Sequence, residues 1–206
     1  MLRSDIVNYL VARFDYKSYL EIGIDNGRNY NRVRCDNKVG VEPDSKKCSF
    51  NSIINQTSDE YFSKLNDTVK FDIIFIDGDH HEEQVDKDIK NSLDHLNSGG
   101  IIVMHDCNPP TMHHAREDGS DLSTPARGKW NGTVWKSFVK LRCTRKDLFM
   151  CVVDTDWGCG IIRPDMTQEI YIDHPVEDCL SWEVFSAERK QILNLVPPSM
   201  LSLAII

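Results

Sequence analysis

Short apolar runs that end directly in polar residues recur in the first half of the chain, and they constrain the fold most. Phe71–Ile76 is followed by Asp77, and Ile101–Met104 is followed by His105 and Asp106. Between these two runs, apolar residues recur at helical spacing. Strands that alternate with helices predict a parallel sheet with helices on both of its faces.

The same patterns predict the other elements. Strands are expected over 18–24, 38–41, 52–55, 71–76, 101–104, 149–153 and 159–162. Helices are expected over 4–14 with Ser4 as cap, from Ser58 to about 65, from Asp79 to the 97–100 turn, over 130–145 and over 182–196. We therefore predict an α/β fold with a doubly wound, mostly parallel, seven-stranded sheet of the Rossmann type, ending in an antiparallel hairpin.

The length of 206 residues favours a single domain over 1–206. Its first half, 1–107, carries the strand–helix alternation. Residues 108–129 contain three prolines and few apolar residues, which predicts a long loop of the lid type. Residues 130–206 form the second half.

Composition excludes several classes of protein. There are 24 basic and 32 acidic residues, a net charge of −8, which argues against a general nucleic-acid binder. No apolar run approaches the roughly 20 residues of a membrane span. The seven cysteines form no C-x-x-C pair, so we expect reduced thiols and a cytoplasmic protein. We expect no role for the N-x-T triplets at Asn55, Asn66 and Asn131.

Ligands of open α/β sheets bind beyond the carboxyl ends of the strands, so the first strand end is informative. A dinucleotide site would need G-x-G-x-x-G, but Asp25 stands between Gly23 and Gly27. Glu21 suits a ligand ammonium group, and the two glycines allow close approach of the backbone. Glu42, about 20 residues further on, suits ribose hydroxyls. These features fit S-adenosylmethionine; the alternative is that Glu21 and Gly23 only terminate a strand.

Five segments carry a family resemblance: YLEIGIDNG, VGVEPD, TSDEYF, FDIIFIDGDHHEEQVDKDI and LNSGGIIVMHD. They resemble the class I S-adenosylmethionine-dependent methyltransferases, and are most similar to the bacterial group of sugar and antibiotic O-methylation. The resemblance covers about residues 15–107, and GKWNGTVWKSFVKLR and DTDWGCGII resemble that group's downstream half. Asp25 in place of a second glycine departs from the wider superfamily.

The resemblance implies where the cofactor binds. Glu21 and Gly23 would border its methionine part, and Glu42 would hold its ribose. The residues implied at the adenine are Pro43, Ser58 and Asp59.

Asp77, His105 and Asp106 follow two strands that should be neighbours in the sheet. Two carboxylates and an imidazole suit a divalent cation with open positions. The catechol-type metal-dependent O-methyltransferases hold magnesium with carboxylates at these strand ends, and this chain is similar. His105 in place of a carboxylate also admits manganese or iron. The alternative is a polar strand end that contacts substrate or cofactor without metal.

Methyl transfer to an alcohol needs either a cation that lowers the hydroxyl pKa or a base that removes the proton. His80 occupies the position of the catalytic lysine of the catechol-type enzymes, and imidazole suits a base. Asp79 is the second candidate, but Asp79 and Glu82 also match a helix capping box, which we favour. We expect His80 and Asp77 to be catalytic.

Residues 127–146 contain seven basic residues and no acidic one. This segment favours either a solvated helix face or a docking site for an anionic acceptor such as a phosphorylated sugar. Trp130 and Trp135 lie in it and could support sugar rings, and His113 and His114 are weaker candidates for substrate contact.

Together these observations predict a methyltransferase that acts on a hydroxyl oxygen, of a sugar or glycan precursor, with magnesium or manganese assistance left open. Three alternatives remain: methylation of a nitrogen or another small metabolite, an NAD-dependent oxidoreductase, and a non-catalytic cofactor-binding subunit. The acceptor's identity and the oligomeric state stay open, a homo-oligomer included.

Overall fold

A central β-sheet organises the chain. The computed structural model describes residues 1–44, 53–171 and 173–205, so Ser52 of the predicted third strand and Cys48 lie outside these ranges. The described strands are β1 (Ser18–Ile22), β2 (Asn37–Val41), β3 (Ile53–Ile54), β4 (Phe71–Ile76), β5 (Leu96–Met104), β6 (Phe149–Val153), β7 (Cys159–Arg163) and β8 (Leu195–Val196). Their order in the sheet is β3-β2-β1-β4-β5-β7-β6-β8.

The direction of the strands matches the prediction. Strands β1 to β5 are parallel, whereas β7 runs antiparallel to both β5 and β6 and forms the predicted C-terminal hairpin. Among the described residues the sheet has eight strands instead of seven, because the two-residue β8 pairs with β6. The expected doubly wound, mostly parallel α/β fold is confirmed.

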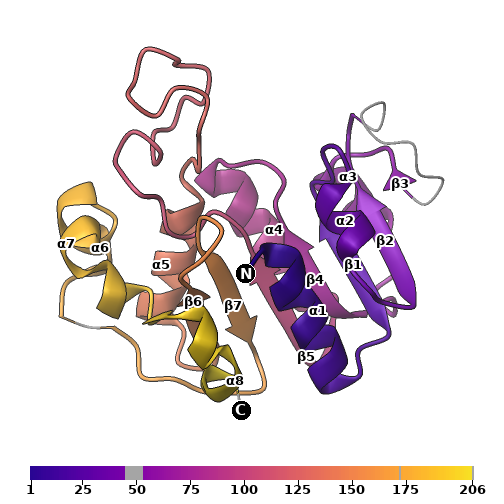
Figure 1. Ribbon diagram of the computed structural model, residues 1–206. Helices are drawn as coiled ribbons and strands as arrows, with labels where there is room; N and C mark the ends of the chain where they lie inside the picture. Colours follow the sequence, from indigo (N-terminus) through magenta and orange to yellow (C-terminus); the bar gives the residue numbers. More distant parts are fainter. Residues whose placement is uncertain (45–52, 172, 206) are drawn as a thin grey trace.

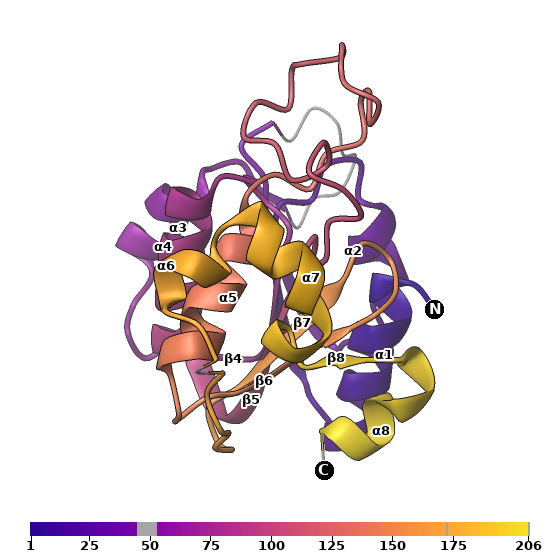
Figure 2. The ribbon, with the colours of Figure 1, turned by 90° about the vertical axis from the view of Figure 1, so that its left-hand side faces the viewer.

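Helices cover both faces of this sheet (Figures 1 and 2). They are α1 (Arg3–Phe14), α2 (Arg28–Arg32), α3 (Ser58–Lys64), α4 (Glu82–Asp94), α5 (Val134–Thr144), α6 (Val176–Cys179), α7 (Trp182–Ile192) and α8 (Leu201–Ala204), with a short 3₁₀ turn at Pro198–Met200. Helices α1, α2 and α8 pack on one face, and α3 to α7 pack on the other. None of the helices in the described part of the chain is long and apolar enough to cross a membrane.

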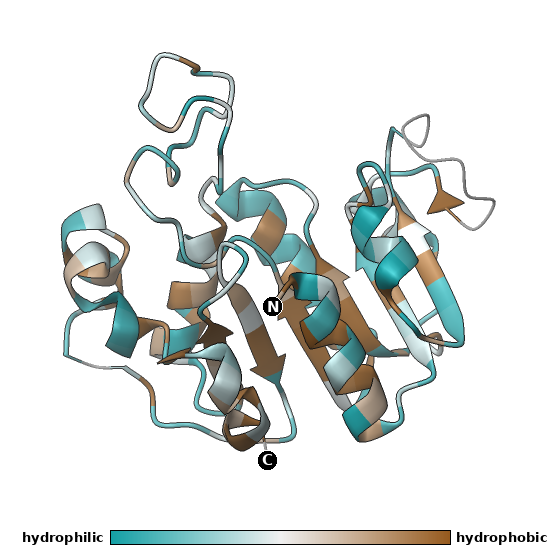
Figure 3. Cartoon of the chain, viewed as in Figure 1, coloured by the Kyte–Doolittle hydropathy of each residue, from teal (hydrophilic) through white to brown (hydrophobic). Residues whose placement is uncertain are grey.

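The apolar strands explain this two-sided arrangement. Ile74 and Ile76 of β4 belong to the core under α3 to α7, and Ile73 and Phe75 belong to the core under α1 and α8. Successive strand residues point to opposite faces, so a strand covered on both faces has to be apolar throughout. Figure 3 shows the central strands as the most hydrophobic part of the chain.

Two helix starts differ from the prediction. Ser4 lies inside α1 and is buried, so it does not cap the helix. Thr57 is the N-cap residue of α3: its Oγ1 accepts a hydrogen bond from the Glu60 amide at 3.2 Å, which leaves Ser58 inside the first turn. Serine and threonine share this capping chemistry, so the TSDE sequence allows a shift of one residue.

The start of α4 also differs. Its N-cap residue is His81, and Asp79 Oδ1 accepts a hydrogen bond from the His81 amide at 2.9 Å instead of forming the predicted capping box. At the other end the helix stops at Asp94, and the 97–100 stretch belongs to β5. The predicted helix over 182–196 ends at Ile192 and is followed by β8.

Candidate active site

The strand order reverses between β1 and β4, and the main cavity lies at that switch point. In open α/β sheets, ligands bind in the crevice outside the carboxyl ends of the strands at such a point. The cavity measures about 930 Å³ and is lined by the ends of β1, β2, β4 and β5, by α3 and α4, by the long loop and by the β6–β7 turn. This volume lies within the range of about 300–1,000 Å³ of small-molecule sites.

Gly23 forms the floor of this cavity where β1 and β4 meet. Its φ is +83°, and an added Cβ would lie 2.1 Å from the backbone oxygen of Asp77. Glycine alone accepts that backbone conformation and that contact. Gly27 also has a positive φ, but it caps α2 and does not line the cavity.

Glu42 lines the cavity from the end of β2 and is almost fully buried. Its Oε2 accepts hydrogen bonds from the amides of Ile24 (3.1 Å) and Asp25 (2.9 Å), and its Oε1 accepts one from the amide of Asp44 (3.0 Å). Three backbone donors therefore fix the carboxylate. A carboxylate has about four lone-pair sites, so one acceptor site stays open, on Oε1.

The predicted adenine residues Pro43, Ser58 and Asp59 all line the same cavity. Gln84 of α4 lines it too, and its Nε2 lies 3.2 Å from Ser58 Oγ and 3.0 Å from Asp59 Oδ1. Gln84 was not among the residues predicted from the sequence. Its place in the first turn of α4, four residues after His80, is the signal that could have found it.

Glu21 does not line the cavity, contrary to its expected place beside the methionine part. On β1 it shares a face with Tyr19, because side chains two residues apart in a strand point the same way. The Tyr19 hydroxyl and the Asn29 amide nitrogen both donate to Glu21 Oε2. Burial raises the pKa of Glu21 to about 8.

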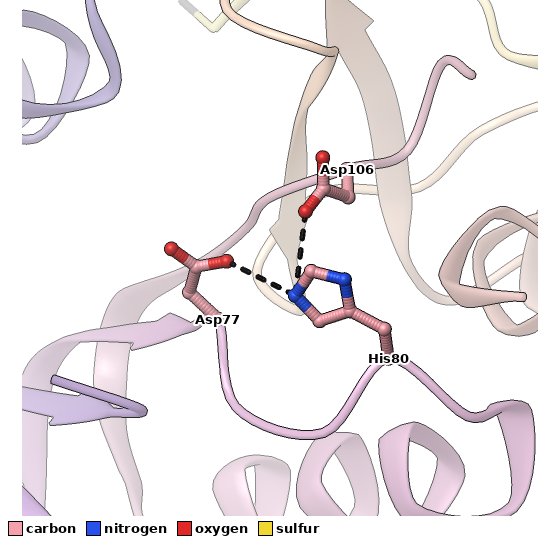
Figure 4. A group of neighbouring side chains, drawn as sticks. All are labelled: Asp77, His80 and Asp106. Atoms are coloured by element: carbon pink, nitrogen blue, oxygen red, sulfur yellow. Dashed lines mark ion pairs between the residues drawn. The ribbon is translucent and has the colours of Figure 1, made fainter. Parts of the chain in front are cut away.

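Three side chains converge at the ends of β4 and β5. His80 Nε2 lies 3.7 Å from Asp77 Oδ1 and 3.4 Å from Asp106 Oδ2, and Figure 4 shows the imidazole between the two carboxylates. One donor atom from each residue can be chosen so that all three lie within 4.8 Å of one another. We call Asp77, His80 and Asp106 the acidic cluster.

In the acidic cluster, the carboxylates stabilise the protonated form of His80, and the basic groups stabilise the ionised form of Asp77. Burial disfavours the charged form of His80, but hydrogen bonding to Asp77 and the charge of Asp106 outweigh it and raise its pKa. Burial likewise opposes ionisation of Asp77, but the basic groups around it lower its pKa well below the ordinary value. These groups are His105, His80 and Arg3.

His105 takes a different place from the one expected of a metal ligand. It is buried, and the Arg3 Nη1 atom lies 2.6–2.7 Å from its two ring nitrogens. Its Nδ1 is 3.2 Å from Asp77 Oδ1, and its Nε2 is 3.6 Å from Asp156 Oδ1. His105 is therefore tied into contacts with protein groups, and His80 replaces it in the set that can share a cation.

Arg3, Asp156 and Trp157 are contributions that the sequence analysis missed. The Arg3 amide donates to Asp156 Oδ2 at 2.8 Å, and Thr155 Oγ1 donates to the Met1 carbonyl at 2.7 Å. These contacts fasten the start of the chain to the β6–β7 turn. Arg3 and Trp157 line the cavity there, and no local pattern predicts a contact over 153 residues.

The basic segment 127–146 does not gather at the cavity, where only Gly128 and Trp130 of this range line the wall. Lys140 pairs with Glu82 and Asp86, and Arg145 pairs with Asp147. These pairs favour a solvated helix face over an anion-docking surface.

The remaining candidates for substrate contact lie elsewhere. Trp135 is buried in the core against Phe185. His113 and His114 do not line the cavity, although the His114 ring packs against Trp157 with centroids 5.4 Å apart.

The comparisons agree with this fold. Residues 20–107 match a family model described as a methyltransferase domain. A methyltransferase of Podospora anserina with bound S-adenosylhomocysteine is 18% identical, with a TM-score of 0.59 over 81% of this chain and 78% of that one. An O-methyltransferase of Bacillus cereus in complex with the same molecule is 15% identical, with a TM-score of 0.55 over 78% and 79%.

A third solved structure is TomG of Streptomyces achromogenes, an O-methyltransferase of tomaymycin synthesis in complex with S-adenosylmethionine. It is 14% identical, with a TM-score of 0.54 over 78% of both chains. No curated protein sequence matches this chain.

The chain shares its fold with these three solved methyltransferase structures. The family model matches residues 20–107, and this range includes most of the residues that line the cavity. These comparisons confirm the fold predicted from the sequence.

Proposed function

We propose that this chain transfers a methyl group from S-adenosylmethionine to a hydroxyl oxygen of a sugar or glycan precursor. The observation that carries the proposal is the position of the acidic cluster: Asp77 contacts Gly23 at the switch point, in a cavity that Glu42 also lines. The cofactor's binding groups and a proton acceptor thus share one cavity.

The residues at the β2 end fit the nucleoside half of the cofactor. Glu42 presents a fixed, buried carboxylate to ribose hydroxyls. Ser58, Asp59 and Gln84 offer hydrogen-bonding groups to the adenine edge. Gly23 allows the methionine half to pass close to the backbone.

The acidic cluster supplies the proton transfer. The acceptor oxygen attacks the methyl carbon in line, the carbon–sulfur bond breaks, and its electron pair stays on sulfur. His80 Nε2 accepts the hydroxyl proton, and the carboxylates of Asp77 and Asp106 stabilise the resulting imidazolium. The raised pKa of His80 makes it a stronger base than a solvated imidazole.

A divalent cation is the second candidate for activating the hydroxyl, and the donor set of the acidic cluster favours it. The two carboxylates suit magnesium or manganese, the imidazole admits manganese or iron, and the three donor atoms lie within 4.8 Å of one another. Such a cation would lower the pKa of the acceptor hydroxyl. His80 would then be a ligand instead of the base, so the two candidates exclude each other.

The part of the cavity wall formed by the β6–β7 turn supports an acceptor site. Trp157 and Arg3 line it, and the turn residues Asp156 and Trp157 both have positive φ, at +47° and +66°. Such a conformation is costly for a bulky residue and is retained mainly at functional sites. An indole beside polar groups suits a hydroxylated ring.

The test is transfer of labelled methyl groups from S-adenosylmethionine to a panel of free sugars, sugar phosphates, nucleotide sugars, phenols and amines. We expect product from hydroxylated sugars. Asp77→Asn and His80→Ala should abolish transfer and spare S-adenosylhomocysteine binding, with the exposed Asp94→Asn as control. Turnover that survives chelation excludes the cation, and products from amines alone contradict the proposal.

A further inference from the structure

Four consecutive residues between the long loop and α5 hold the acidic cluster. Each residue of 130–133 contacts either His80 or Asp106, although the two segments are about 25 to 50 residues apart in sequence. From the sequence we expected no role for the N-x-T triplet at Asn131 and a sugar contact for Trp130. We name Trp130, Asn131, Gly132 and Thr133 the positioning segment.

Trp130 fixes the plane of the His80 ring. The two rings stack with centroids 5.0 Å apart and planes inclined by 27°. Gly119 packs against the same indole: an added Cβ there would lie 2.6–2.9 Å from three of its atoms. Trp130 thus contacts both His80 and Gly119 while it lines the cavity.

This stacking replaces a hydrogen bond that His80 lacks. Among the described residues, no group pairs with His80 Nδ1, which is buried. A functional imidazole is usually oriented by a hydrogen bond on its second nitrogen. Here the indole takes over the orientation and turns Nε2 toward Asp77 and Asp106.

Asn131 fixes the second carboxylate. It is fully buried, and its Nδ2 donates to Asp106 Oδ1 at 2.7 Å. The other oxygen, Asp106 Oδ2, is the one that faces His80. Asp106 has a φ of +61°, a conformation that non-glycine residues seldom adopt and that surrounding contacts must hold in place.

Gly132 and Thr133 fix the backbone of His80. The Thr133 amide donates to the His80 carbonyl at 2.8 Å. Gly132 has a φ of +65°, and an added Cβ would lie 2.3 Å from that same carbonyl oxygen. The turn that places His80 is thus closed by direct backbone contact.

The loop that precedes the positioning segment is itself fastened by one side chain, Arg116. Its Nη atoms donate to four backbone carbonyls, those of His113 (2.6 Å), Arg127 (2.7 Å), Lys129 (2.9 Å) and Gly119 (3.1 Å). The Trp130 Nε1 donates to the Arg116 carbonyl at 2.7 Å. The Arg116 guanidinium therefore holds the backbone of the loop that leads into the positioning segment.

We propose that residues 130–133 are positioning residues for methyl transfer: Trp130 orients the imidazole of His80 by stacking, and Asn131 orients the carboxylate of Asp106. The catalytic part of this inference rests on the proposed function, whereas the orientation of His80 does not.

The first test observes His80 directly by NMR in the cofactor-free protein, with Trp130→Phe and Trp130→Leu as a matched pair. An aromatic ring stacked on the imidazole shifts its ring-proton signals upfield. We expect this shift in the wild type and in Trp130→Phe, and its loss in a folded Trp130→Leu. Unchanged His80 signals in a folded Trp130→Leu would overturn the proposal.

The second test measures catalysis and cofactor binding separately. By analogy with residues that orient metal ligands, Trp130→Leu and Asn131→Ala should each lower kcat roughly 10- to 100-fold. The S-adenosylhomocysteine affinity should stay unchanged, and Trp130→Phe should restore most of kcat. A loss of cofactor affinity equal to the loss of kcat contradicts positioning. If no S-adenosylhomocysteine binds at all, the proposed function fails while the NMR result still decides the orientation of His80.

Discussion

The α-carbon of Gly23 packs against the backbone carbonyl of Asp77 so closely that an added Cβ would lie 2.1 Å from the oxygen. The Asp77 amide also donates to the Ile22 carbonyl at 2.9 Å, immediately before this contact. Gly23 at the end of β1 and Asp77 at the end of β4, which both line the cavity, are thereby held at a fixed separation.

This contact predicts that Gly23→Ala destabilises the protein and abolishes S-adenosylhomocysteine binding, since the backbone of β4 has to move. Gly99→Ala is the matched control: its φ of +77° is similar, but no atom lies within 4 Å of its added Cβ. Both variants carry the backbone strain of about 1–2 kcal/mol, and only Gly23→Ala adds the clash. Equal losses of thermal stability and equal cofactor affinities in the two variants would refute the role of the contact.

Glu42→Gln should weaken S-adenosylhomocysteine binding about 10- to 100-fold, because a hydrogen bond to a charged acceptor contributes about 1.5–3 kcal/mol. The loss should appear in the dissociation constant measured by calorimetry. Glu83→Gln, on the exposed side of α4, is the control and should bind as the wild type does. A Glu42 variant with wild-type affinity would remove this residue from the ribose site.

The raised pKa of Glu21 should make the free energy of unfolding depend on pH. Its pKa is about 8 in the folded protein, against an ordinary value of 4.5. Between these values the folded chain holds a proton that the unfolded chain has released, so stability falls as pH rises through this window. Each pKa unit corresponds to about 1.4 kcal/mol.

Glu21→Gln should remove that dependence, because glutamine cannot ionise. Chemical unfolding at pH 5 and pH 9 should show a smaller loss for Glu21→Gln than for the wild type. If the two proteins lose the same stability over this range, Glu21 is not the group responsible.

We expect a substitution of Trp157 to affect acceptor binding and to leave cofactor binding unchanged. Trp157 lines the cavity at the β6–β7 turn, and β7 and β2 lie on opposite sides of β1 and β4 in the sheet. Trp157→Leu should raise the KM for the acceptor several-fold and leave S-adenosylhomocysteine affinity unchanged. The KM is measured by steady-state kinetics with the acceptor found in the panel. A change in cofactor affinity alone would contradict a place for Trp157 in the acceptor site.

The features that the sequence could predict are those with a local cause. The strand over 71–76 has the predicted bounds, because an apolar run between polar turns needs no distant partner to define it. Gly23 and Glu42 reach the cavity because parallel strands end at one edge. Asp77 and Asp106 meet for the same reason.

The features that the sequence could not predict depend on long-range contacts or on the face of the sheet toward which a side chain points. Glu21 and Gly23 are two residues apart, yet the Glu21 side chain turns toward Tyr19 and away from the cavity. His80 takes the place beside Asp77 and Asp106 that was expected of His105, and Arg3 of the first helix contacts the His105 ring. Asn131 meets Asp106 across 25 residues without any pattern linking them.

The central claim is that the switch-point cavity binds S-adenosylmethionine. Calorimetric titration of the wild-type protein with S-adenosylhomocysteine and, separately, with NAD tests it most directly, with Glu42→Gln and Glu83→Gln measured beside it. The account predicts binding of S-adenosylhomocysteine on the order of micromolar, weakened by Glu42→Gln alone, and no binding of NAD. Binding of NAD without binding of S-adenosylhomocysteine would contradict it.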